Sequence, residues 1–169
     1  KTDELIRSAQ IDALTGLYNK KTTETKINNI LTSLDGPDKG ALIIMDIDKF
    51  KSINDTYGHA IGDTVLKEFG NFIYGRFSDS GIVGRIGGDE FIVFINDITS
   101  IEFVLDKIRQ FIEDVHQLKF SEFPDTITTS IGIAYFPDSG DCFMDLYKNA
   151  DTALYHTKQN GRDGFSVFQ

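Results

Sequence analysis

The pattern of hydrophobic and polar residues divides the chain into alternating helices and strands. In several segments apolar residues recur three or four positions apart, which is the spacing of one face of a helix. The predicted helices cover residues 1–12, 20–34, 60–77, 100–119 and 141–160. Shorter runs that are continuously apolar or rich in β-branched residues predict strands instead. The predicted strands cover residues 41–45, 82–86, 90–95, 126–136 and 165–168.

The order and character of these elements predict an α/β (α+β) domain. The strand at 41–45 is apolar at every position, as expected for a strand buried on both faces of a sheet. The segments 82–86 and 90–95 are joined through two glycines and an aspartate, which favours a β-hairpin. This order favours a ferredoxin-like or palm-type arrangement, in which helices flank a central, mostly antiparallel sheet.

The length of the chain, 169 residues, fits one domain, which we expect to cover residues 13–169. Residues 1–12 begin without a methionine and are too short for a stable isolated helix. We therefore expect them to be the end of a helix that connects to an upstream sensory or dimerisation domain.

Charge and cysteine content narrow the function classes. The formal net charge is -9, which argues against binding nucleic acid through a basic surface. A polyphosphate substrate would need local help from metal ions, a few cationic side chains or backbone amides. The single cysteine, Cys142, excludes an internal disulfide framework and suits a reducing compartment.

With no transmembrane-length apolar run and no signal peptide, we expect a cytoplasmic domain. Attachment of the full-length protein to a membrane is left open.

Two pairs of acidic residues are the candidates for chemistry, because both lie where predicted strands end. Asp46 and Asp48 follow the buried strand, and Asp89 and Glu90 lie at the tip of the hairpin. Neighbouring strands would bring these acids together as oxygen ligands for Mg²⁺. Taken singly, each pair has a structural alternative: Asp-x-Asp after a strand is typical of turns and helix caps, and Gly-Gly-Asp is typical of hairpin turns.

Five short blocks, in order along the chain, carry a further signal. The pentapeptide at 87–91 is Gly-Gly-Asp-Glu-Phe. The other blocks are 12–20 (D-x-L-T-G-L-x-N followed by Lys20), 46–55 (D-x-D-x-F-K-x-x-N-D), 58–63 (G-H-x-x-G-D) and 150–162 (A-D-x-A-L-Y-x-x-K-x-x-G-R). Together they resemble the GGDEF family of bacterial diguanylate cyclases over nearly the whole chain, although that family has Arg where this chain has Lys20. Five ordered blocks outweigh the structural alternatives.

The resemblance implies a role for each matching residue. Asp46, the backbone carbonyl of Ile47, Asp89 and Glu90 would hold metal, and Asp89 and Glu90 would be catalytic. The substrate-binding residues would be Asn54, Asp63, Phe50, Lys51, Gly87, Gly88, Lys158 and Arg162. Within this set Asn54 and Asp63 would contact the guanine edge, because a carboxylate accepts from guanine N1–H and N2–H₂ and an amide can meet O6 or N3.

The resemblance also implies the reaction, the cofactor and the partners. Two GTP molecules would condense into cyclic di-GMP with release of two pyrophosphates, using Mg²⁺ or Mn²⁺, two ions in each half-site. Each domain would bind one GTP, so catalysis would need a homodimer. The alternative is a non-catalytic regulatory module that binds GTP or cyclic di-GMP.

One motif of the family is missing. Many members carry an inhibitory product site, R-x-x-D, five residues before the first glycine of the signature. Ser78 and Gly81 stand at the Arg and Asp positions, while Arg76 and Asp79 lie out of register. We therefore expect the inhibitory site to be absent.

Overall fold

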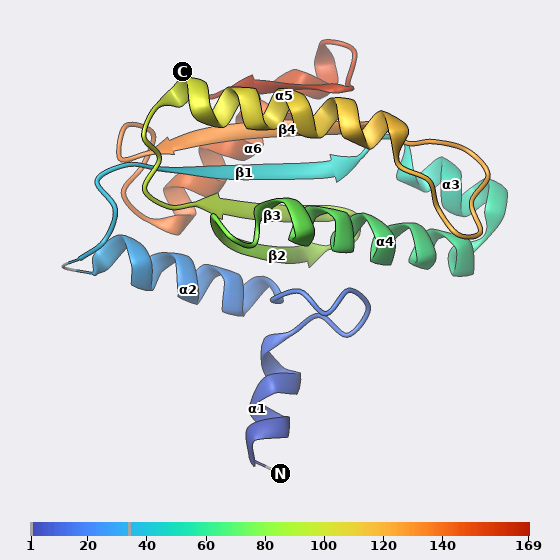
Figure 1. The fold of residues 1–169 in the computed structure, drawn as a ribbon, viewed down its shortest axis with the longest axis horizontal. Helices are drawn as coiled ribbons and strands as arrows, with labels where there is room; N and C mark the ends of the chain where they lie inside the picture. Colours follow the sequence, from blue (N-terminus) through green and yellow to red (C-terminus); the bar gives the residue numbers. More distant parts are fainter. Residues whose placement is uncertain (1, 34) are drawn as a thin grey trace.

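The computed structural model describes residues 2–33 and 35–169 and has a five-stranded sheet at its centre (Figure 1). The strands lie in the order β2-β3-β1-β4-β5. Their bounds are β1 Gly40–Ile47, β2 Gly81–Gly87, β3 Glu90–Ile95, β4 Thr129–Phe136 and β5 Gly164–Val167. All neighbouring pairs are antiparallel except β4 and β5, which are parallel. The predicted α+β class with a mostly antiparallel, palm-type sheet is confirmed.

Helices cover both faces of the sheet, with α4 and α5 on one face and α2 and α6 on the other (Figure 1). Their bounds are α1 Thr2–Gln10, α2 Lys20–Thr32, α3 Phe50–Tyr57, α4 His59–Phe77, α5 Ile101–Gln117 and α6 Phe143–Gln159. The first helix, α1, projects away from this layered body and buries none of its described residues. None of the helices in the described parts of the chain has the length and apolar character needed to cross a bilayer.

Strand β1 is apolar from Ala41 to Met45 because each of its faces meets a separate core. Ile43 and Met45 pack with α4 and α5, whereas Leu42 and Ile44 pack with α2 and α6. Since side chains alternate along a strand, Asp46 continues the row of Leu42 and Ile44 at the end of the strand. The sheet therefore aims Asp46 toward the face that α6 covers.

Helix α3 is absent from our prediction. It has only eight residues, with buried Ile53 as its single fully packed position, so its apolar pattern is too short to be distinctive. It begins directly after Lys49, whose φ of 57° is left-handed and turns the chain sharply out of β1. This turn places α3 beside the end of the central strand.

Some predicted boundaries also differ from the structure. Strand β4 begins at Thr129 rather than at residue 126, because Ile47, its partner in the register, is the last residue of β1. The predicted helices 1–12 and 20–34 include Lys1 and Leu34, which lie outside the described residues.

Candidate active site

A cavity of about 430 Å³ opens where β1 ends, next to the β2–β3 hairpin. Its lining comes from four parts of the chain: the end of β1, the start of α3, the hairpin turn and the end of α6. The lining residues are Asp46, Ile47, Lys49, Phe50, Lys51, Asn54, Gly88, Asp89, Lys158 and Arg162. Most of the residues predicted for the site therefore line one cavity. Gly87, Glu90 and Asp63 lie outside this lining, and Lys49 is a lining residue that the sequence did not identify.

Asp46 is the most buried acid of this cavity, with 7% of its surface exposed. Its Oδ2 lies 2.5 Å from Nζ of Lys158 on α6. Its Oδ1 is buried and has no hydrogen-bond partner among the described residues. Burial raises the pKa of Asp46 to about 6, although the hydrogen bond and charge of Lys158 act in the opposite direction.

Asp89 and Glu90 approach Asp46 from the hairpin. Asp89 Oδ2 accepts a hydrogen bond from the backbone N–H of Ile47 at 3.2 Å, which joins the hairpin to the end of β1. Glu90 is the register partner of Asp46, so the two side chains leave the same face of the sheet. Burial raises the pKa of both Asp89 and Glu90.

Glu90 has a partner that the sequence did not predict. The hydroxyl of Tyr147, on α6, donates a hydrogen bond to Glu90 Oε1 at 2.5 Å. Burial and this contact raise the pKa of Tyr147, so its hydroxyl stays protonated and acts as a donor. Tyr147 therefore fixes the orientation of Glu90 beside Asp46.

The residues present fit a hard divalent cation. Such ions prefer carboxylate and backbone carbonyl oxygens, which Asp46, Ile47 and Asp89 supply around the cavity. Asp46 Oδ1, buried and unpartnered within the described chain, is the observation that supports a cation here. A bound cation would give this oxygen the partner that the described residues do not provide.

Asn54, on α3, contributes an amide to the lining of the same cavity. Asn54 Oδ1 is buried and has no hydrogen-bond partner among the described residues. Gly62 of α4 packs against it so closely that a Cβ there would lie 1.8 Å from Asn54 Oδ1. Asp63 follows Gly62 but is exposed and lies outside the cavity lining. The structure thus brings Asn54 to the cavity and leaves Asp63 at its margin.

Cationic side chains and a helix N-terminus also line the cavity. Lys51, Lys158 and Arg162 all line the cavity. The start of α3 also faces it, and no side chain caps that helix terminus. Uncapped N–H groups at a helix N-terminus bind anions well, particularly beside Lys and Arg. This part of the cavity is suited to phosphate groups.

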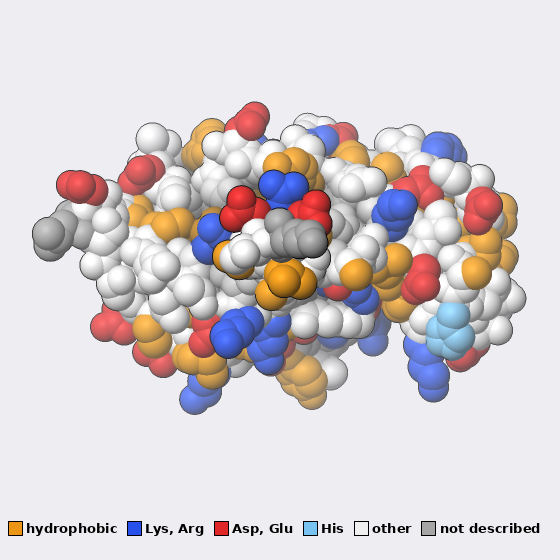
Figure 2. Space-filling model, turned by 90° about the horizontal axis from the view of Figure 1, so that it is seen from below, with side chains coloured by type: hydrophobic (Ala, Val, Ile, Leu, Met, Phe, Trp, Pro, Cys, Tyr) orange, Lys and Arg blue, Asp and Glu red, His pale blue; other side chains and the backbone are white. Residues whose placement is uncertain are grey.

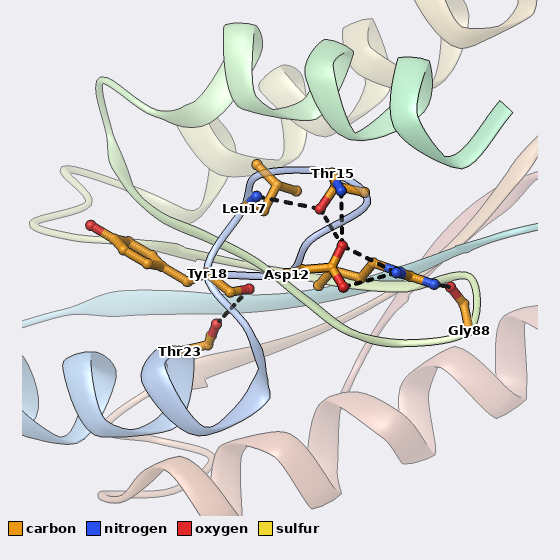
Figure 3. Close-up of polar contacts among 7 residues, drawn as sticks. Asp12, Thr15, Leu17, Tyr18, Thr23 and Gly88 are labelled. Atoms are coloured by element: carbon orange, nitrogen blue, oxygen red, sulfur yellow. Dashed lines mark hydrogen bonds and ion pairs between the residues drawn. The ribbon is translucent and has the colours of Figure 1, made fainter. Parts of the chain in front are cut away.

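The hairpin turn is tied to the N-terminal segment. Gly88, with φ of 53°, provides the left-handed turn. Arg85 donates to its carbonyl oxygen from Nη2 at 2.7 Å and from Nε at 3.0 Å. Arg85 Nη1 also donates to both carboxylate oxygens of Asp12, at 2.9 and 3.1 Å. Asp12 in turn accepts from the Thr15 N–H and hydroxyl, and Figure 3 shows this chain of contacts reaching Gly88. The segment after α1 is therefore connected to the active-site turn.

The fold and the cavity define a class of protein: a palm-type domain with clustered carboxylates at the strand ends. A family model described as "Diguanylate cyclase, GGDEF domain" matches residues 9–164. The bifunctional diguanylate cyclase/cyclic di-GMP phosphodiesterase MucR of Pseudomonas aeruginosa is 34% identical over 169 residues, covering 98% of this chain and 24% of MucR. This chain belongs to the GGDEF family of nucleotidyltransferase-type cyclase domains, whose members in general depend on divalent metal.

Solved structures agree with this assignment. The GGDEF domain of YfiN (TpbB) from Pseudomonas aeruginosa has a TM-score of 0.85 and 32% identity, with 94% of each chain covered. The active GGEEF domain of a diguanylate cyclase from Vibrio cholerae has a TM-score of 0.79 and 28% identity, covering 90% of this chain and 98% of that one. The curated relatives are far longer than this chain: it spans 24% of the length of MucR, and 15% and 42% of the lengths of DgcE and DgcC from Escherichia coli.

Because these carboxylates are buried, we expect both cation-dependent GTP binding and folding stability to depend on pH. Protons compete with a cation for Asp46, whose pKa is raised to about 6, so the Mg²⁺ concentration that half-saturates GTP binding should rise as pH falls from 7.5 to 5.5. The effect on folding without metal has the opposite sign. The folded state holds the Asp46 proton more tightly than the unfolded chain, so this stabilisation is present below pH 3.8 and is lost as pH rises through about 6.

Calorimetric titration of Mg²⁺ and GTP at several pH values tests the first effect, and thermal unfolding in EDTA tests the second. The Asp46→Asn variant is the control, because asparagine does not titrate. It should lose the part of the pH dependence of binding and of stability that Asp46 causes. Affinity that stays constant across this pH range would contradict the prediction.

Proposed function

We propose that this domain condenses two GTP molecules into cyclic di-GMP and releases two pyrophosphates, with Mg²⁺ or Mn²⁺ and two ions in each half-site. The observation that carries the proposal is that two residues lining one cavity, Asp46 and Asn54, each have a buried Oδ1 without a hydrogen-bond partner among the described residues. The first fits a cation and the second fits a donor on a purine base. Cationic side chains line the same cavity and would contact a triphosphate bound there.

The chain's own groups bind and orient the nucleotide in this proposal. Asn54 accepts from the guanine edge, and Asp63 approaches from the margin of the cavity. Lys51, Arg162 and the uncapped start of α3 hold phosphate oxygens. Phe50, Gly87 and Gly88 border the nucleotide, since glycines let a ligand approach the backbone. Lys158, paired with Asp46 here, has a flexible stem long enough to turn to a phosphate.

Asp46, the Ile47 carbonyl, Asp89 and Glu90 form the acidic side of the site. Divalent cations held there would neutralise phosphate charge and favour ionisation of the attacking hydroxyl. In each half-reaction a 3′-oxygen bonds to the α-phosphorus of the other GTP. The bond from that phosphorus to pyrophosphate breaks, and the hydroxyl proton is released.

This chemistry requires two copies of the domain that face each other, because one cavity holds one GTP. Helix α1 is the proposed end of the upstream connecting helix, within the domain boundaries 1–12 and 13–169. Its Leu5 and Ile6 are 72% and 51% exposed. Figure 2, seen from the side on which α1 projects, shows apolar, acidic and basic side chains interspersed. The upstream segment is proposed to be sensory or dimerising and to set the distance between the two half-sites.

Incubation with GTP and Mg²⁺, followed by separation of the nucleotides, tests the function. Cyclic di-GMP and pyrophosphate should form in a ratio of one to two, and specific activity should rise with enzyme concentration because two half-sites must meet. Binding of GTP without product at high enzyme concentration would instead favour the non-catalytic module. If the chain neither binds GTP nor converts it, both the cyclase and the non-catalytic GTP-binding module are ruled out.

Feedback by the product is expected to be weak. Ser78 and Gly81 line a separate cavity together with two acids, Asp79 and Asp97, which would repel the phosphates of cyclic di-GMP. A Cβ at Gly81 would lie 1.7 Å from the carbonyl oxygen of Phe94, so the backbone leaves no room for a carboxylate there.

The nearby Arg76 does not replace the missing arginine, because its Nη2 is paired with Asp114 Oδ2 at 2.6 Å. Calorimetry with cyclic di-GMP and progress curves with added product should therefore show little binding and little inhibition. The Arg76→Ala variant should behave in the same way. Submicromolar binding with strong non-competitive inhibition would contradict this prediction.

A further inference from the structure

Asp48, the second acid of the Asp-x-Asp pair, takes no part in the cavity lining described above. It is 8% exposed, and both of its carboxylate oxygens are occupied by protein donors. Oδ1 accepts from the Ser130 hydroxyl at 2.5 Å, and Oδ2 accepts from the Thr128 hydroxyl at 2.6 Å. Oδ2 also accepts from the backbone N–H of Asp163 at 3.0 Å. This carboxylate is therefore committed to bonds within the protein.

The bond to Asp163 reaches the turn that carries Arg162. Arg162 and Asp163 have φ values of 61° and 45°, and both are left-handed although both have a Cβ. Such backbone is disfavoured for residues other than glycine, so surrounding contacts must hold it. Asp48 supplies one such contact from the end of β1, which lies 115 positions away in sequence.

Two further contacts hold the same turn. The Arg162 N–H donates to the carbonyl oxygen of Thr157 at 3.0 Å. On the other side, Asp163 Oδ1 lies 2.7 Å from Nε2 of His116 on α5. The turn is thus fixed from α6, from α5 and, through Asp48, from the strand that carries Asp46.

The side chain of Arg162 is not fixed in this way. Its guanidinium has no ion-pair partner within 4.0 Å among residues 2–33 and 35–169. Arg162 borders both the cavity of Asp46 and a second, larger cavity that Asp48 and Asp163 also line. The direction of the guanidinium toward one cavity or the other therefore depends on the backbone of the turn.

We propose that Asp48 is a positioning residue, which holds the Arg162–Asp163 turn so that Arg162 is directed at the phosphates of GTP. This inference rests on the proposed function, because it needs GTP in the cavity of Asp46. It assigns different roles to the two acids: Asp46 binds the metal, whereas Asp48 accepts a hydrogen bond from the Asp163 N–H and so positions the neighbouring Arg162.

The rival role for Asp48, a metal ligand, makes the opposite prediction for asparagine. In Asp48→Asn the amide oxygen can still accept from Thr128 and Asp163, and the amide nitrogen can donate to the Ser130 hydroxyl, which is able to accept. A positioning role should therefore survive this change, whereas a metal ligand would lose its charge. In Asp48→Ser the side chain is shorter, so its hydroxyl is drawn back from the N–H of Asp163 and from the hydroxyls of Thr128 and Ser130.

Hydrogen exchange of the Asp163 amide tests the clamp without GTP. In Asp48→Ser this amide should exchange about tenfold faster or more, while in Asp48→Asn it should stay within about threefold of the parent chain. Ser100→Ala is the matched control, since it removes the N-terminal cap of α5, a contact outside this turn. Unchanged protection in Asp48→Ser, or protection lost equally in Asp48→Asn, would overturn the proposal.

A double-mutant cycle on GTP affinity tests the link to Arg162. Calorimetry with Mg²⁺ and a non-hydrolysable GTP analogue should show about tenfold weaker binding for Asp48→Ser, but less than about twofold when Arg162→Ala is already present. Asp48→Asn should stay within about threefold. It also keeps the test decisive if Asp48→Ser fails to fold, since loss of binding in folded Asp48→Asn refutes the positioning role.

The outcomes distinguish failure of the positioning role from failure of the proposed function. Equal weakening by Asp48→Ser with and without Arg162 would overturn the positioning role and leave the proposed function intact. Failure of the parent chain to bind the analogue would overturn the proposed function, and the inference with it.

Discussion

Replacing Asp46 with asparagine is expected to lower cyclic di-GMP formation by about 10²-fold or more, the scale seen when one preorganised electrostatic contact is lost from an active site. Asp46 is buried at the end of β1, and its Oδ1 has no partner among the described residues. Asparagine keeps the shape but removes the charge that a cation and a triphosphate require. Lys158, which lies 2.5 Å from Asp46, would lose its counter-charge as well.

The measurement is kcat at saturating GTP over a range of Mg²⁺ concentrations. Asp138→Asn is a suitable control, because Asp138 is an exposed acid in the loop that follows β4. Glu90→Gln should also reduce kcat, since Glu90 faces Asp46 in the strand register. Near-normal turnover of Asp46→Asn at high Mg²⁺ would remove Asp46 from the metal site.

The long, strongly periodic elements were predictable from the sequence, and the short ones were not. The apolar run of β1 correctly indicated a strand buried on both faces, and the two glycines before Asp89 correctly indicated the hairpin. Helix α3 was missed because eight residues contain too few apolar positions to define a helical period. The start of β4 was misplaced because the length of its partner β1, and not its own β-branched residues, decides where the ladder begins.

The sequence predicted most of the residues that line the cavity, but not the residues that support them. Most of the residues chosen from the family blocks line one cavity, because those blocks meet at the ends of β1, β3 and α6. Tyr147 and the partners of Asp48 were missed, because their contacts join residues far apart in sequence. Lys49 stands inside the Asp-x-Asp block, yet only its left-handed φ, which the letters do not reveal, brings it to the cavity. Each of these supporting contacts is a tertiary feature.

The preference for GTP over ATP is expected to be about 10³-fold or more in kcat/KM. A site built to hydrogen-bond a substrate donor rejects an analogue that lacks it by large factors, because a buried polar group is then left unpaired. Asn54 Oδ1 is such a group, since it is buried and has no partner among the described residues. Adenine has an acceptor at N1 and no amino group at C2, so a base bound in the orientation of guanine offers this oxygen no donor from those two positions. Asp63 adds less than Asn54, because it is exposed to water that can replace a lost hydrogen bond.

The test compares GTP, ATP and ITP in the parent chain and in the variants Asn54→Ala and Asp63→Asn. Asn54→Ala should lose most of its preference for GTP over ATP, mainly by losing activity with GTP, whereas Asp63→Asn should lose a smaller part. Gly62→Ala is an independent check, because a Cβ 1.8 Å from Asn54 Oδ1 must displace the amide and should resemble Asn54→Ala. ITP, which keeps N1–H but lacks the amino group, should fall between GTP and ATP. Comparable turnover of ATP and GTP by the parent chain would show that Asn54 does not select the base.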